Sequence, residues 1–326
     1  PAEFRAVAHR TTTYGSRDAV LAYAAPVALI ATLLTWLGLL FVGFALLLFS
    51  FSPLDMAASF REAGSSLFTL GFASTDRAQL TLVDFLAAAT GPIVVGLLIG
   101  YLPSLYASYN RREVEVALLH SRSGEPNWGP EILLRHAIVN SEEELVTLWR
   151  DWEHWAADVA ESHVNYPVLI HVRSAQPMRN WLIALLSVMD AAALQLSLNP
   201  QVAQGPARVA LRQGFVAVRD IAHAEGIAVD DDPDPDSGVT LTFEECVHAY
   251  EQLVASGYAM ARSAEDAWPH FRGWRVNYES AAYRLAERID AVPAMWSGTR
   301  NPPLPVVAPE RPTNRMPGGR TGRPVI

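Results

Sequence analysis

Two long stretches without a charged side chain lie in the first third of the chain and limit what it can fold into. No charged residue occurs from Ala19 to Leu54, and none occurs from Phe85 to Asn110. About 20 consecutive apolar residues are enough for an α-helix to cross a bilayer. A single segment in hydrocarbon must also satisfy its own backbone hydrogen bonds, and a helix does so. We therefore predict an all-α membrane protein with transmembrane helices at about residues 21–51 and 82–108.

The segment between the two predicted spans divides into a short helix and a turn. Residues 57–68 are mostly small or apolar, but the stretch is too short to cross a membrane. A helix of half length is tolerated at membrane depth where protein surrounds it. The tetrapeptide Thr69-Leu70-Gly71-Phe72 follows directly. We predict a re-entrant helix and an adjoining loop over residues 57–75.

This pattern resembles the pore loop of the bacterial two-transmembrane potassium-channel family, whose filter reads Thr-Val/Leu-Gly-Tyr/Phe-Gly-Asp. The tetrapeptide Thr69-Leu70-Gly71-Phe72 matches its first four positions. The second span ends in Gly100-Tyr101-Leu102-Pro103, and Arg111-Arg112-Glu113 follows. This ending resembles one branch of the family, in which the inner helix leads into a helical cytoplasmic domain. The resemblance extends over roughly residues 19–291.

The resemblance implies a cation channel of the bacterial plasma membrane, with potassium as the permeant ion. The backbone carbonyls of Thr69, Leu70, Gly71, Phe72 and Ala73 would replace the water shell of that ion. One pore loop per chain does not close a ring, so the resemblance implies a homotetramer in the lipid bilayer. It implies no catalytic residue, no cofactor and no metal site beyond that of the permeant cation.

The sequence departs from the family at Ala73 and Ser74, where the family has Gly and Asp. A row of inward-pointing carbonyls needs residues of alternating handedness. Gly adopts the left-handed conformation freely, whereas an L-residue such as Ala does so at about 1–2 kcal/mol. Asp76 is close enough to replace the missing carboxylate. Two interpretations remain open: a channel with an altered outer mouth, or a non-conducting or weakly selective relative that acts as a membrane-anchored sensor or scaffold.

Glycine and proline recur along the second predicted span. Gly91, Pro92, Gly96 and Pro103 are candidates for a gating hinge, because proline removes a helical hydrogen bond and bends the helix. The alternative for the glycines is close packing of helices through small residues.

Arginines flank both predicted spans. Arg10 and Arg17 precede the first, and Arg111 and Arg112 follow the second, so the positive-inside rule places both flanks in the cytoplasm. We predict a cytoplasmic N-terminal segment at residues 1–18, with further sequence expected upstream of Pro1. We further predict a pore domain at 19–112, a cytoplasmic helical domain at 113–291 and a disordered Pro/Gly/Arg-rich tail at 292–326.

The predicted helical domain carries two strong helix signals. Ser141 and Glu144 have the spacing of a capping box, and apolar residues recur at helical spacing from Leu145 to Val159. The segment from Trp181 to Leu198 is apolar but is interrupted by Asp190, so we predict a buried core helix and not a third span. Residues 113–140 read as a connector.

Composition and spacing weigh against other functions. The net charge of −9 makes nucleic acid an unfavourable partner, and the single cysteine, Cys246, rules out an intramolecular disulfide. His154, Asp158 and Glu161 have a spacing that can hold a metal, but surface pairs of this kind are far commoner. A membrane-anchored enzyme built on His154, Glu161 and His163 is the weakest interpretation, since no nucleophile lies beside them.

Overall fold

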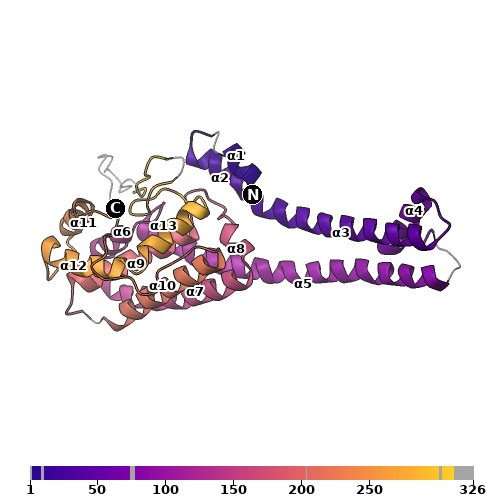
Figure 1. The fold of residues 1–326 in the computed structure, drawn as a ribbon. Coiled ribbons are helices and arrows are strands. Elements are labelled where there is room, and N and C mark those ends of the chain that lie inside the picture. The colour runs from indigo at the N-terminus through magenta and orange to yellow at the C-terminus, as the bar shows by residue number, and fades with distance from the viewer. Residues whose placement is uncertain (1, 9–10, 74–77, 203, 301–302, 312–326) are drawn as a thin grey trace, which may run out of the picture. The chain divides into compact units, whose positions relative to one another are not determined.

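The computed structural model describes residues 2–8, 11–73, 78–202, 204–300 and 303–311, and this part of the chain is helical (Figure 1). Residues 23–107 form one compact unit, here called the apolar unit, and residues 2–22 with those from 108 onward form the other, the bundle unit. The apolar unit and the helices leading to it comprise α1 (Ala2–Ala8), α2 (Tyr14–Ala22), α3 (Ala24–Phe51), α4 (Met56–Leu67) and α5 (Ala78–Ser123).

Three stretches of helix are long and apolar enough to cross a membrane: Tyr14–Phe51, Leu80–Ser123 and Trp181–Leu198. In the most apolar 18-residue window of the first no residue is buried, and in that of the second 11% are buried. In the third, α9 (Trp181–Leu198), every residue is buried. The prediction of a buried core helix is therefore confirmed for α9, whereas α3 and α5 have the composition and exposure of a membrane protein.

Helix α5 is longer than the predicted span. It continues for 46 residues through Pro92 and Pro103 and ends at Ser123. Residues 113–140, predicted to be a connector, are thus mostly helical, because Val116 and Leu119 are buried in the core of the bundle unit. A further helix, α6 (Gly129–Ile138), follows after a short turn. One uninterrupted helix therefore belongs to both units.

The bundle unit is built around α9. Helices α6, α7 (Leu145–Asn165), α10 (Gly205–Ala224), α12 (Ala264–Arg275) and α13 (Glu279–Arg288) all contact it. The apolar stripe predicted for α7 is buried, including Trp149, Trp152 and Trp155. Asp190, in the middle of α9, is paired with Arg275 and accepts a hydrogen bond from the Tyr278 hydroxyl at 2.8 Å. This pairing is what permits a carboxylate in the core.

The ends of several helices differ from the sequence prediction. The capping box at Ser141 does not form; residues Glu142–Glu144 make a 3-10 turn (η1) and α7 begins at Leu145. A capping box occurs instead at α11 (Phe243–Ser256), between Thr242 and Glu245. The short helix α8 (Val168–His171) follows α7.

The C-terminal segment also differs from the predicted disorder at residues 292–326. Trp296 is 6% exposed, and Arg300 donates hydrogen bonds to the carbonyls of Ala291 and Val292. Arg311 forms an ion pair with Glu131 of α6 at 2.6 Å. The arginines of this segment thus attach it to the bundle unit; residues 312–326 lie outside the described part.

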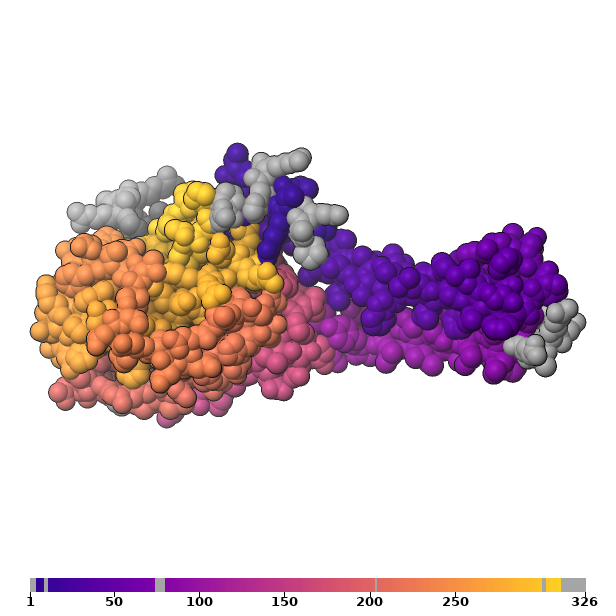
Figure 2. Space-filling model, in the orientation of Figure 1, coloured from indigo at the N-terminus to yellow at the C-terminus, as the bar shows by residue number. Residues whose placement is uncertain are grey.

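One arginine beside each predicted span, Arg17 and Arg112, is buried and has a structural role. Arg17 of α2 forms an ion pair with Asp290 at 2.6 Å, and the side chain of Arg112 is fully buried. Arg112 donates to the carbonyls of Leu169 and Val172, each at 2.8 Å, and lies 3.1 Å from Nε2 of His163. In the space-filling view the indigo N-terminal helices lie beside yellow residues of the same unit (Figure 2).

His163 makes stability depend on pH. Burial, and secondarily the Arg112 guanidinium, hold its pKa well below the ordinary value of 6.5. The unfolded chain therefore binds a proton below pH 6.5 that the folded chain excludes, so stability falls as the pH drops, by up to about 1.4 kcal/mol per pH unit. In His163→Gln we expect a shallower fall of the unfolding free energy between pH 6.5 and pH 5. Tryptophan fluorescence of the protein in detergent measures this unfolding.

The matched control is His154→Gln, at an exposed position of the same helix. It should keep the slope of the unsubstituted protein, to which the buried His136 and the exposed His171 also contribute through lowered pKa values. Equal slopes in the two variants would contradict the role assigned to His163.

Candidate functional site

The candidate site is the loop that follows α4. Asp55 caps the start of α4 by accepting a hydrogen bond from the amide of Ala58 at 2.7 Å. The helix packs on α3, where the rings of Phe41 and Phe60 meet edge to face with centroids 5.3 Å apart. One face of α4 is buried, including Ser65 and Leu67. This packing fixes where the loop begins.

The end of α4 is a Schellman-type cap. The amide of Leu70 donates to the carbonyl of Ser65 at 2.8 Å, and the amide of Thr69 donates to that of Ser66 at 3.0 Å. The cap places Thr69 in the left-handed region, with φ 55°. Glycine usually occupies that position, and a β-branched residue there is a genuine outlier. Strain of about 1–2 kcal/mol is therefore held at Thr69.

Backbone handedness alternates beyond this cap. Thr69 and Gly71 have positive φ, at 55° and 68°, while Leu70 and Phe72 do not. The carbonyl oxygens of Thr69, Leu70, Gly71 and Phe72 accept no hydrogen bond from any residue that the structure describes. Four successive carbonyls are thus available to a ligand or to another chain.

Ala73 differs from the four residues before it. The Ser65 hydroxyl donates to the Ala73 carbonyl at 3.0 Å and accepts from the Ala73 amide at 2.9 Å. The Thr69 hydroxyl, predicted at the inner end of an ion site, donates to the carbonyl of Phe68 at 2.8 Å. Of the five predicted ion-binding residues, Ala73 is therefore the one whose carbonyl already has a partner. Ser74 and Asp76 lie outside the described residues.

The predicted hinge residues fall into two groups. A Cβ added at Gly91 would lie 1.9 Å from the carbonyl oxygen of Leu67, so α4 and α5 approach closely there. Nothing lies within 4 Å of a Cβ added at Gly96. Pro92 and Pro103 lie inside the continuous helix α5. The packing interpretation therefore has direct support at Gly91.

A second contact between α4 and α5 was not foreseen. The Ser66 hydroxyl donates to Oδ1 of Asp84 at 2.5 Å. The signal in the sequence was the position of Asp84, directly before the uncharged stretch that begins at Phe85. A carboxylate from the second long helix thus supports the end of α4.

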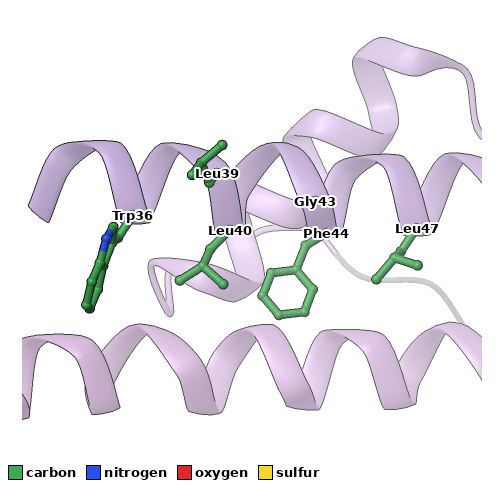
Figure 3. Close-up of a pocket in the computed structure, with 6 residues that line it drawn as sticks. All are labelled: Trp36, Leu39, Leu40, Gly43, Phe44 and Leu47. Atoms are coloured by element: carbon green, nitrogen blue, oxygen red, sulfur yellow. The ribbon is translucent and has the colours of Figure 1, made fainter. Parts of the chain in front are cut away.

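Two hollows of the apolar unit are lined by its long helices. One, of about 440 Å³, is lined by Trp36, Leu39, Leu40, Gly43, Phe44 and Leu47 of α3 (Figure 3). The other, of about 430 Å³, lies between α3 and α5, with Leu33, Trp36, Leu97 and Tyr101 among its lining residues. Neither is lined by an acidic, basic or histidine side chain. Their surfaces suit hydrocarbon or another apolar helix.

Three residues considered for a metal site or an enzyme active site each contact a different side chain. Asp158 pairs with Arg111 at 2.9 Å, and Glu161 accepts a hydrogen bond from Asn165 at 2.8 Å. His163 is buried against Arg112. No group of three potential metal ligands occurs within the described ranges.

Comparison with known proteins identifies no relative: no family model, curated protein or solved structure matches the chain.

The close approach at Gly91 predicts a size limit. In Gly91→Ala the new methyl group would collide with the Leu67 carbonyl, and we expect the free energy of unfolding to fall by about 1–3 kcal/mol or more. Thermal unfolding in detergent should show a lower midpoint for this variant than for Gly96→Ala, whose methyl group meets open space. Equal midpoints would show that α4 and α5 do not approach this closely.

The Ser65 contacts predict a local effect on the loop. Ser65→Ala removes both hydrogen bonds to Ala73, each worth about 0.5–1.5 kcal/mol. Amide hydrogen exchange of Ala73 should accelerate by roughly tenfold, the factor that 1.4 kcal/mol gives. Ser50→Ala, which removes a hydroxyl bonded only within α3, is the matched control and should leave Ala73 unchanged.

Proposed function

We propose that the chain is the subunit of a membrane-embedded cation channel, formed by four copies, that conducts potassium through residues 69–72. The alternating handedness at Thr69 and Gly71 is the observation that carries the proposal, together with four carbonyls that accept no hydrogen bond from the described residues. A row of such carbonyls can replace the water shell of a cation. In this proposal α3 and α5 are the spans, and α4 is the re-entrant helix between them.

The division of the chain supports a topology with both flanks on one side. Residues 2–22 and those from 108 onward belong to one compact unit. The helix entering the first span and the helix leaving the second therefore belong to the same unit, as a chain with both flanks on one side of a membrane requires. The arginines that flank both spans support a cytoplasmic location of the bundle unit.

Assembly of copies is supported by uncovered side chains beside the loop. Phe68, Leu70 and Phe72 are 51%, 62% and 55% exposed in the single chain. Large apolar side chains grouped in this way mark an interaction surface. In a tetramer the neighbouring subunits would cover them.

A non-conducting relative is the second candidate, and the contacts of Ala73 favour it. Both backbone groups of Ala73 are held by Ser65, so the row of available carbonyls ends at Phe72. A shorter row would hold fewer ions. The chain would then act as a sensor or scaffold through its bundle unit.

Ion flux from liposomes separates the two candidates. We expect the purified protein to release potassium down a gradient faster than sodium. Gly71→Ala should abolish the flux, because Gly71 has φ 68° and an L-residue there is strained by about 1–2 kcal/mol in each subunit. Gly205→Ala, at an unobstructed glycine of α10, should conduct normally.

The outer mouth is tested by Ala73→Gly combined with Ser74→Asp. If the original protein is inactive and this variant conducts, the non-conducting interpretation is correct. If folded tetramers of both remain without flux, the channel proposal is wrong.

A further inference from the structure

Residues 169–173 of the bundle unit contact the helix that leaves the second long apolar stretch. The carbonyls of Leu169 and Val172 each accept a hydrogen bond from the Arg112 guanidinium at 2.8 Å. The carbonyl of Arg173 accepts one from the Tyr109 hydroxyl at 3.3 Å. Three carbonyls of one short segment therefore hold two successive turns of α5.

The side chain of Arg173 reaches in the other direction, to α2. It forms an ion pair with Asp18 and donates to the hydroxyl of Tyr14 at 3.2 Å. It also donates to the carbonyls of Ile289 and Asp290, at 2.7 and 3.1 Å. Helix α2 leads into α3 through Tyr23 alone.

These contacts are buried, which makes them act together. The side chains of Arg173, Asp18 and Asp290 are each no more than 9% exposed, and that of Arg112 is fully buried. Separating a buried ion from its partner leaves an uncompensated charge, so partial release is strongly unfavourable. The contacts of the segment with both helices are therefore costly to break.

We propose that residues 169–173 are a coupling segment that holds the bundle-unit ends of both long apolar helices and makes them move together. Arg173 and Arg112 are its positioning residues. The effect on conduction rests on the proposed channel function, whereas the mechanical coupling does not. Coupled sites influence one another reciprocally, commonly by 5–150-fold.

The reciprocal influence of the two helices is tested by measuring amide hydrogen exchange of the full-length protein in lipid nanodiscs. Asp18→Asn alters only the α2 side, and Tyr109→Phe removes only the hydroxyl contact on the α5 side. We expect Asp18→Asn to accelerate exchange in residues 109–116 at least fivefold, and Tyr109→Phe to do the same in residues 14–22. Arg272→Gln, which breaks an ion pair with Asp236 remote from this segment in sequence, should change neither.

The interior of α9 reports whether a variant still folds. If Asp18→Asn also accelerates exchange there, Tyr109→Phe alone decides the matter. Coupling is overturned if a folded variant accelerates exchange only in its own helix. Potassium flux is measured in parallel. Reciprocal exchange without flux in any variant would reject the channel function and leave the coupling intact. Flux without reciprocal exchange would reject the coupling and leave the channel function intact.

Discussion

The unbroken course of helix α5 is the constraint on which both units depend. Backbone hydrogen bonds join each turn of an α-helix to the next, although Pro92 and Pro103 each lack the N–H that would make one of these bonds. Helix α5 has 46 residues, of which the first part supports the end of α4 and the last part is buried in the bundle unit. Its two prolines lie within this continuous helix.

Arginine side chains make several of the buried polar contacts, and the chain has no lysine. A guanidinium has five donors in a fixed plane and can satisfy several carbonyls at once. Arg112 and Arg300 do this with backbone oxygens, and Arg275 does it with Asp190, Glu279 and the carbonyl of Trp296. These contacts join segments that are distant in sequence, which apolar packing alone would specify less uniquely.

The long apolar helices and the core helices could be predicted because their signals are local. The absence of charge marks α3 and α5, and helical spacing of tryptophans marks α7. The left-handed conformation of Thr69 could not be predicted, because no local preference places a β-branched residue there. The attachment of residues 292–311 was missed for a related reason. A composition rich in Pro and Arg is typical of disorder, and only the fold brings Glu131 to Arg311.

The ion pair between Arg17 and Asp290 has a consequence for biosynthesis. Asp290 is made long after Arg17, because it lies near the other end of the chain. In the proposed channel, the charge of Arg17 would contribute to the orientation of the first apolar helix during its insertion. Once the last helices have been translated, the same charge is part of the folded interior. In that proposal one residue acts first on the direction of insertion and later on the closure of the fold.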